Sequence, residues 1–240
     1  MNRQNPSEDP AWIDWRERFA ELYDQSNYES PLQKWVMRSS HALVEKPFGE
    51  SAFFERVLEI GAGTGEHLPF VRHRFSTYIM SDSNQKALDV AKRKLPGAKN
   101  EQVLFEVEEG GGLSYPDDSF DRVVAVHVLE HINKPHLALK EWRRVVKPGG
   151  MLSILIPTDP GVAWRIGRCL GPRRNAIAKG IAYDYVMARE HVNPCNNLVA
   201  LVRHYFSNAV EAWWPLRVPS MDLNLFCAFH AVVHKQGSRQ

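Results

Sequence analysis

Cysteine is scarce in this chain, and its three cysteines are scattered. Cys169, Cys195 and Cys227 form no CxxC pair and no metal-ligand spacing, and an odd count argues against a disulfide framework. We therefore interpret them as reduced thiols. This cysteine usage predicts a cytoplasmic protein and gives no indication of a metal site, so we expect none.

A charge excess of one sign and long hydrophobic runs are also missing. Lys and Arg number 30 and Asp and Glu 28, so the net charge of +2 gives no overall footprint for a nucleic acid. No apolar run reaches the ~18 residues of a membrane-spanning helix, and residues 1–15 lack the apolar stretch of a secretory signal. We expect a soluble monomer or homodimer with no nucleic-acid partner, and a peripheral membrane contact stays open.

The middle of the chain alternates between strand and helix patterns. A length of 240 residues with 44% hydrophobic residues suits one α/β domain. The apolar pattern predicts strands near residues 56–60, 76–82, 103–109, 120–132, 151–157, 209–217 and 224–235, and helices near 67–75, 83–95, 136–146 and 194–207. We expect a Rossmann-like, doubly wound α/β sheet of about seven strands. It would be mostly parallel with an antiparallel last strand and with helices on both faces.

Two segments depart from this alternation. Residues 11–46 carry apolar and aromatic residues at helical spacing, which predicts an N-terminal helical cap over residues 1–46. The remaining domain, residues 47–240, is interrupted at about 158–192 by a stretch too long for a simple loop. We expect this insertion to contain short helices and to act as a lid.

A glycine-rich turn gives the strongest functional signal. The sequence VLEIGAGTG, residues 57–65, reads as a strand running into three glycines ahead of a predicted helix, and Gly61 and Gly63 would let the backbone approach a ligand closely. Dinucleotide sites use G-x-G-x-x-G, whereas the spacing here is G-x-G-x-G. Glu59 precedes the turn, and a carboxylate there opposes a pyrophosphate but suits a cation. S-adenosylmethionine carries an ammonium and a sulfonium and no phosphate.

The end of the next predicted strand supports a nucleoside ligand. Asp82 lies about twenty residues after the glycine turn, where a carboxylate can accept hydrogen bonds from both hydroxyls of a ribose. A simple turn with no ligand is the alternative, but it leaves this combination of features unexplained.

Four stretches resemble one enzyme family. VLEIGAGTG, YIMSD, LSYPDDSFDRVVAVHVLEHI and EWRRVVKPGGMLSILIP follow one another over residues 55–157. In order and spacing they are similar to the motifs of class I S-adenosylmethionine-dependent methyltransferases. The resemblance extends to the small-molecule group that includes ubiquinone and menaquinone biosynthesis enzymes, known as methyltransferase type 11.

This resemblance implies S-adenosylmethionine as cofactor and assigns a set of contacts to it. The residues at the matching positions are Tyr23, Glu59, Gly61, Ala62, Gly63, Thr64, Asp82, Ser83, Glu109 and His127. Glu109 is the nearest match to an acidic residue that contacts adenine in the family, although the glycine triplet after it departs from the family pattern.

Histidines and the insertion would serve the methyl acceptor. His127, His131 and His191 are candidate catalytic bases, since imidazole titrates near neutral pH; for His131 a purely structural role beside Glu130 is the alternative. The candidate acceptor-binding residues are Tyr28, Arg165, Arg168, Tyr183, Tyr185 and His191. The arginines of the insertion suit an anionic acceptor, an anionic membrane surface, or simply a solvated basic face.

The resulting hypothesis is an S-adenosylmethionine-dependent methyltransferase that acts on an O or N atom of a small metabolite, which the arginines would allow to be anionic. One alternative is a methyltransferase for a lipid or a lipid-linked or surface saccharide at the membrane. Another is a non-catalytic S-adenosylmethionine-binding interaction protein. The glycine spacing disfavours a nicotinamide oxidoreductase, and the absence of an N/D-P-P-Y/F stretch disfavours a nucleic-acid substrate.

Overall fold

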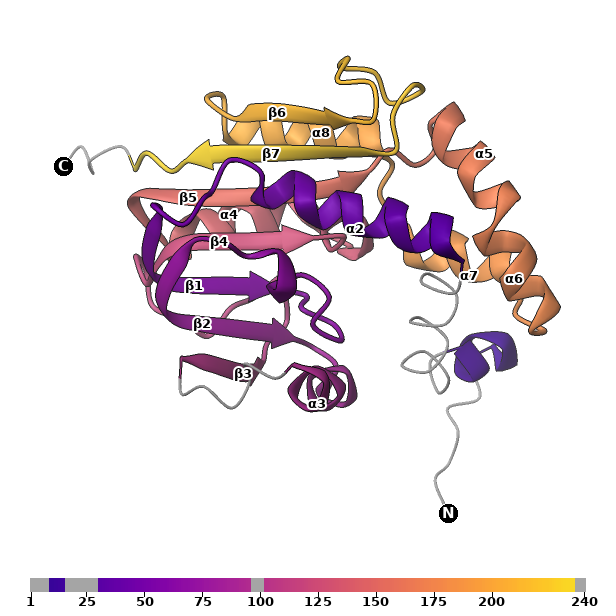
Figure 1. The fold of residues 1–240 in the computed structure, drawn as a ribbon, viewed down its shortest axis with the longest axis horizontal. Coiled ribbons are helices and arrows are strands. Elements are labelled where there is room, and N and C mark those ends of the chain that lie inside the picture. The colour runs from indigo at the N-terminus through magenta and orange to yellow at the C-terminus, as the bar shows by residue number, and fades with distance from the viewer. Residues whose placement is uncertain (1–8, 16–29, 96–101, 236–240) are drawn as a thin grey trace.

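A seven-stranded sheet in the order β3-β2-β1-β4-β5-β7-β6 forms the centre of the computed structural model, which describes residues 9–15, 30–95 and 102–235 (Figure 1). Its strands are β1 (Phe53–Ile60), β2 (Arg74–Asp82), β3 (Val103–Val107), β4 (Phe120–Val126), β5 (Val146–Pro157), β6 (Val210–Trp214) and β7 (Phe226–Val232). Strand β7 is antiparallel to both of its neighbours, β5 and β6, and the other strand pairs of the described residues are parallel. The predicted sheet, including its antiparallel last strand, is confirmed.

Helices cover both faces of this sheet. They are α2 (Pro31–Glu45), α3 (Gln85–Lys94), α4 (Pro135–Val145), α5 (Val162–Leu170), α6 (Pro172–Ala178), α7 (Tyr183–Glu190) and α8 (Cys195–Tyr205). Buried residues of α4 and α8 join one apolar cluster, and those of α2 and α3 join another on the opposite face of the sheet. The fold is therefore doubly wound, and the strand order reverses between β1 and β4, where such sheets bind ligands.

The helix predicted for residues 67–75 is wrong. Residues 66–73, all of them described, contain only a single 3-10 turn, η1 (Leu68–Phe70), and β2 already begins at Arg74. The stretch is too short for a helical crossover, which takes a dozen residues or more. Helix α2, from upstream in the chain, contacts η1, β4 and β5 and covers this part of the sheet instead.

Two other predicted bounds shift. Strand β4 ends at Val126, because His127 adopts a left-handed backbone with φ 59° and the chain then forms a 3-10 turn, η3 (Leu129–His131). Strand β5 begins at Val146 rather than at residue 151.

The insertion at 158–192 does contain short helices, namely α5, α6 and α7. The division into a cap and a larger domain stays a prediction.

No helix of the described residues is long and apolar enough to cross a membrane.

A buried ion pair fixes α2 to the sheet. Arg122 of β4 is fully buried and donates to both carboxylate oxygens of Glu45, the last residue of α2, at 3.0 and 2.6 Å. The Arg122 guanidinium also lies over the Phe48 ring, 4.1 Å from its centroid. Burial opposes the charge on Glu45, but His67 and Arg122 outweigh it and lower the pKa of Glu45 to about 2.

Buried histidines next to this pair make stability depend on pH. Burial, reinforced by the charge of Arg122, lowers the pKa of both His73 and His230 to about 4. Below pH 6.5 these two histidines therefore become protonated in the unfolded chain while they stay neutral in the folded protein. We expect the free energy of unfolding to fall by about 2 kcal/mol per histidine between pH 6.5 and 5.

Urea unfolding at pH 7 and at pH 5 measures this effect. The His230→Gln variant, which keeps a polar partner for the Ser153 hydroxyl that lies 3.1 Å from Nδ1 of His230, should lose less stability on acidification than the wild type. The matched exposed variant His204→Gln should behave like the wild type. Equal losses of unfolding free energy in all three proteins would contradict the lowered pKa of His230 in the folded protein.

Candidate functional site

One large cavity opens at the carboxyl ends of the parallel strands. Its volume is about 1420 Å³, above the 300–1,000 Å³ typical of a pocket for one small ligand. The wall combines the glycine loop after β1, the ends of β2 and β4, the loop after β3, and residues of α5 and α7. This size, and this position where the strand order reverses between β1 and β4, suit two ligands bound side by side.

The glycine loop has the predicted backbone. Gly61, Gly63 and Gly65 have φ of 67°, 52° and 86°, a region that favours glycine. A Cβ on Gly61 would lie 2.4 Å from Cγ2 of Val128. Because no α-helix follows the loop among residues 61–73, all of them described, the helix N-terminus that holds a pyrophosphate in dinucleotide sites is absent here.

Asp82 joins the end of β2 to the glycine loop. Its Oδ2 accepts the Gly63 N–H at 2.8 Å, and its Oδ1 accepts the Asn84 N–H at 2.8 Å. Burial raises the pKa of Asp82, although these two hydrogen bonds oppose the shift. Each carboxylate oxygen keeps a further lone pair, and Asp82 lines the cavity.

Glu59 places a buried carboxylate under the glycine loop. It is 3% exposed, accepts the Tyr78 hydroxyl at 2.8 Å and lines the cavity. Burial raises the pKa of Glu59, with His67 and the Tyr78 hydroxyl opposing the shift. A cationic ligand at this wall would stabilise the carboxylate, whereas a phosphate would be repelled.

The other predicted cofactor residues divide in two groups. Ala62, Thr64, Ser83, Glu109 and His127 all line the cavity, whereas Tyr23 lies outside the described residues, as does the predicted acceptor contact Tyr28.

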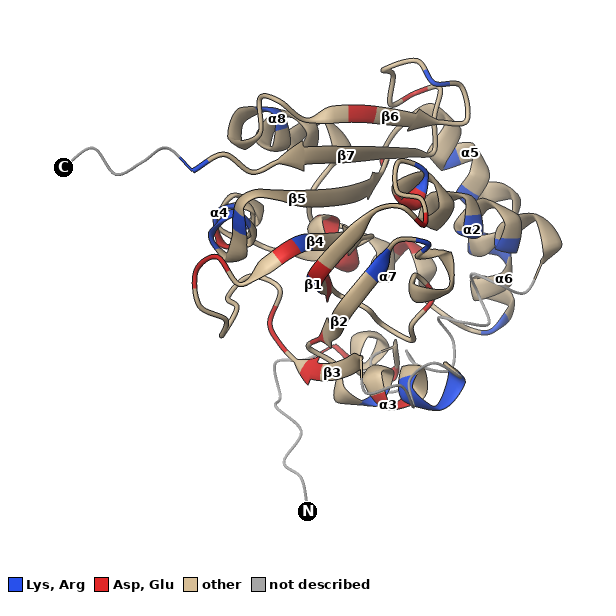
Figure 2. Ribbon diagram, turned by 60° about the vertical axis from the view of Figure 1, so that its left-hand side comes forward, with Lys and Arg blue, Asp and Glu red and all other residues tan. Residues whose placement is uncertain are grey.

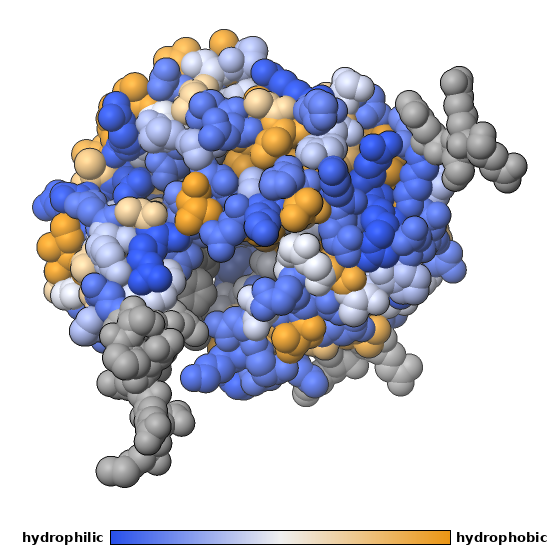
Figure 3. All heavy atoms as spheres, turned by 180° about the vertical axis from the view of Figure 1, so that it is seen from behind, coloured by the Kyte–Doolittle hydropathy of each residue, from blue (hydrophilic) through white to orange (hydrophobic). Residues whose placement is uncertain are grey.

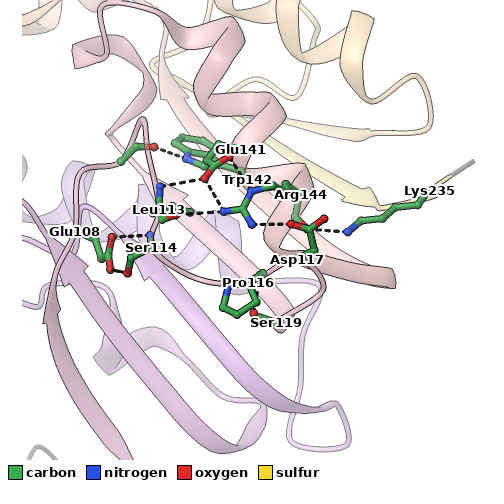
Figure 4. Close-up of polar contacts among 11 residues, drawn as sticks. Glu108, Leu113, Ser114, Pro116, Asp117, Ser119, Glu141, Trp142, Arg144 and Lys235 are labelled. Atoms are coloured by element: carbon green, nitrogen blue, oxygen red, sulfur yellow. Dashed lines mark hydrogen bonds and ion pairs between the residues drawn. The ribbon is translucent and has the colours of Figure 1, made fainter. Parts of the chain in front are cut away.

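The loop after β3, which carries Glu109, is tied to α4. The Trp142 indole donates to the Gly110 carbonyl at 2.7 Å, and Glu141 accepts the Leu113 N–H at 3.1 Å while pairing with Arg144 (Figure 4). These contacts hold Glu109 at the cavity, although the structure leaves its contact with adenine a prediction.

His127 stands at the end of β4 in a fixed orientation. Its Nε2 lies 3.0 Å from the Ser40 hydroxyl of α2, and its Nδ1 lies 3.6 Å from the Glu130 carboxylate. The ring packs edge-on against Phe226 at 5.3 Å. A polar partner thus lies near each ring nitrogen, which suits a positioning role in the wall more than proton transfer.

His131 and His191 meet at the cavity wall, with ring centroids 5.1 Å apart. The His131 Nδ1 lies 2.8 Å from the Glu190 carbonyl and 3.3 Å from the Glu190 carboxylate. Burial opposes the charge on His131, but Glu190 and Glu130 outweigh it and raise the pKa of His131 to about 9.

An aspartate orients His191. The His191 Nδ1 lies 2.9 Å from Oδ2 of Asp159, which Arg168 also contacts at 3.3 Å. When the Nδ1 proton is donated to Asp159, the His191 Nε2 accepts no hydrogen bond from the described residues, which is the arrangement that a general base requires. Sequence reasoning missed Asp159 and Glu190, which no local motif marks.

The predicted acceptor residues are only partly brought together. Arg168, Tyr183 and His191 line the cavity, whereas Arg165 and Tyr185 do not. Arg165 is exposed on α5, and the Tyr185 hydroxyl accepts from Arg189 at 3.0 Å. The helical spacing of the insertion could not show which face of each helix turns inward.

Comparison with known proteins identifies the domain. Residues 58–154 match the family model described as a methyltransferase domain. The demethylmenaquinone methyltransferase of Clavibacter sepedonicus is 32% identical over 108 residues, which cover 45% of this chain and 43% of that protein. The phosphatidylethanolamine N-methyltransferase of Cereibacter sphaeroides is 29% identical over 58% of this chain and 68% of its own length. The alignment thus spans less than half of the first relative.

A solved structure supports the fold over nearly the whole chain. The N-methyltransferase NodS of Bradyrhizobium japonicum, solved with S-adenosylhomocysteine, superimposes with a TM-score of 0.62 at 14% identity, covering 95% of this chain and 100% of NodS. Together with the family match, the glycine loop, Glu59 and Asp82 define a class I S-adenosylmethionine-dependent methyltransferase domain. Residues 58–154 therefore form a methyltransferase domain of this kind, and the cofactor of such domains is S-adenosylmethionine.

Proposed function

We propose that the protein transfers a methyl group from S-adenosylmethionine to an O or N atom of a small acceptor. The observation that carries this is the single cavity in which the cofactor wall, with Glu59 and Asp82, faces the same space as the His131–His191 wall. Its volume of about 1420 Å³ leaves room for an acceptor beside the cofactor.

The chain's residues act mainly by positioning. S-adenosylmethionine supplies an already activated methyl group. Glu59 would hold its ammonium end, Asp82 would accept hydrogen bonds from the ribose, and the glycine loop would lie against it. Alignment of two bound reactants can lower the barrier by about 7–11 kcal/mol in well-oriented cases, so the protein has to orient the acceptor and exclude water.

The acceptor wall suits a hydroxyl or amino nucleophile. The His191 Nε2, oriented through Asp159, can take a proton from such a group. Arg168 is already paired with Asp159 at 3.3 Å. Glu130 and Glu190 line this wall, and Asp159 contacts His191 next to it. The contacts therefore favour a neutral or cationic acceptor over an anionic one.

Release of S-adenosylhomocysteine tests this function. Incubation with S-adenosylmethionine and a panel of hydroxyl- and amino-bearing metabolites should give product with at least one acceptor, detected by mass spectrometry. The His191→Ala variant should bind S-adenosylhomocysteine as the wild type does but turn over more slowly. Tight cofactor binding with no turnover across the panel would favour the non-catalytic interaction role instead.

A second candidate, a methyltransferase for a lipid-linked acceptor, draws on one specific surface. Val162, Ile166 and Leu170 repeat every four residues along α5 and are 44%, 55% and 71% exposed. Basic residues accompany them on α5 and α6 (Figure 2). On the face seen from behind, hydrophobic residues are scattered among hydrophilic ones (Figure 3). An apolar ridge flanked by arginines is typical of a helix that lies on an anionic membrane.

Flotation with vesicles separates the two candidates. If α5 docks on membranes, the protein should float with phosphatidylglycerol vesicles and not with phosphatidylcholine vesicles, and an Ile166→Glu/Leu170→Glu variant should lose at least tenfold in the bound fraction. Val210→Glu, which alters an exposed residue of β6, is the matched control. Recovery of the wild-type protein only in the vesicle-free fraction would exclude this candidate.

A further inference from the structure

Glu130, His131 and His191 form a compact group of metal-ligating side chains at the cavity. One ligand atom of each lies within 4.8 Å of the other two. Glu130 and His131 come from η3 after β4, whereas His191 follows α7, so the fold joins residues about sixty positions apart. All three line the cavity.

Glu130 carries an unpaired oxygen at this point. Its side chain is 2% exposed, and its Oε1 lies 3.6 Å from Nδ1 of His127 and 3.8 Å from Nε2 of His131. Its Oε2 is buried and has no hydrogen-bond partner among the described residues. A buried carboxylate oxygen without a partner is destabilising, and a cation bound at this position would supply the partner.

Both imidazoles are held in the way that metal ligands are held. The His131 Nδ1 faces the Glu190 carbonyl at 2.8 Å, and the His191 Nδ1 faces the Asp159 carboxylate at 2.9 Å. An Nδ1 proton donated to a carbonyl or a carboxylate orients the ring and leaves Nε2 as the ligand atom, which in His131 has to lose its own proton when a metal binds. This outer support accompanies nearly all metal-ligating histidines.

The charge of the surroundings also favours a cation. Glu130, Glu190 and Asp159 bring three carboxylates to the two imidazoles, and among the described ion pairs only Arg168 offers them a permanent positive charge. The three carboxylates and Arg168 together carry a net charge of about −2, and a divalent ion that displaces the proton of His131 would balance it.

We propose that Glu130, His131 and His191 bind one divalent first-row transition-metal ion whose remaining coordination positions face the cavity. Two imidazoles and a carboxylate with an open position form a ligand set typical of catalytic zinc and iron sites. Ligand bonds of about 2.0–2.2 Å bring ligand atoms roughly 3–3.5 Å apart, so the side chains have to close by about 1 Å. The site stands against the sequence-based expectation of no metal.

The role of the ion rests on the proposed function. An acceptor hydroxyl that occupies an open position would have a lowered pKa, so its proton passes to solvent and its oxygen keeps the electron pair that accepts the methyl group. His191 would then act as a ligand and not as the base. Metal binding itself depends on neither cofactor nor acceptor.

Titration of the metal-stripped, full-length chain with Zn²⁺ and with Co²⁺ tests the site without any turnover. We expect one ion per chain, a visible Co²⁺ spectrum of a low-symmetry site, and at least tenfold weaker Zn²⁺ binding in both His191→Ala and Glu130→Gln. The exposed His204→Ala variant should bind as the wild type does. Asp159→Asn, which keeps all three ligands, should weaken binding by about 10–100-fold.

Thermal unfolding shows which variants are folded, and at least one of the two ligand variants, His191→Ala and Glu130→Gln, has to be folded for the comparison to decide. Absence of a one-to-one complex in the wild type, or equal Zn²⁺ affinity in the wild type and in every folded ligand variant, would overturn the proposal and return His191 to the role of base. Binding of S-adenosylhomocysteine, measured separately on the same samples, shows whether the proposed function fails on its own.

Discussion

Replacing Asp82 by alanine should weaken binding of S-adenosylhomocysteine at least 100-fold. The carboxylate accepts the Gly63 and Asn84 N–H groups, each at 2.8 Å, and is the group expected to accept two ribose hydroxyls. Loss of two hydrogen bonds to a charged acceptor, at about 1.5–3 kcal/mol each, corresponds to about two or more factors of ten. Isothermal titration calorimetry measures the change.

Two further variants make this result specific. Asp89→Ala removes an exposed carboxylate from α3, seven residues further along the chain, and should bind like the wild type. Asp82→Asn keeps an acceptor oxygen but loses the charge, so its affinity for S-adenosylhomocysteine should lie between those of the wild type and Asp82→Ala. If Asp82→Ala is folded and binds within threefold of the wild type, Asp82 does not hold the ribose.

Replacing Glu45 by leucine should lower the free energy of unfolding by about 3–5 kcal/mol. Arg122 is fully buried and pairs with Glu45 through two hydrogen bonds, so the single change leaves an unpaired charge in the core. The double variant Glu45→Leu/Arg122→Met removes both charges and should recover most of the loss. Guanidinium unfolding at pH 7 measures both values.

The outcome also reports on α2. Since Glu45 is the last residue of α2 and Arg122 lies in β4, the pair connects the N-terminal segment directly to the sheet. A loss below 1 kcal/mol in Glu45→Leu would mean that this connection contributes little and that α2 is held by apolar packing alone.

Local sequence patterns were enough to predict that the residues expected to bind the cofactor lie together. The glycine turn, Glu59 and Asp82 lie at the ends of two neighbouring parallel strands, β1 and β2. Strand periodicity and glycine spacing therefore place them together without knowledge of distant contacts. The antiparallel last strand was predictable for the same reason, because the closing hairpin is local.

The acceptor side depends on contacts between distant residues. His191 meets Asp159, and His131 meets Glu190, across 32 and 59 positions, which no local pattern encodes. A helix was wrongly predicted between β1 and β2 because the apolar residues at 68, 70, 71 and 75 have a spacing similar to that of a helix. The part of the sheet left uncovered there is occupied by α2, so tertiary packing decided the outcome.

Cofactor selectivity of the wild-type protein tests the central claim most directly. Calorimetric titration with S-adenosylhomocysteine and, in parallel, with NADH compares the two ligand classes that use glycine turns after a first strand. We predict one S-adenosylhomocysteine per chain with micromolar affinity, and no heat from NADH. Folded protein that binds NADH, or that does not bind S-adenosylhomocysteine, would contradict the assignment of this cavity as a methyl-transfer site.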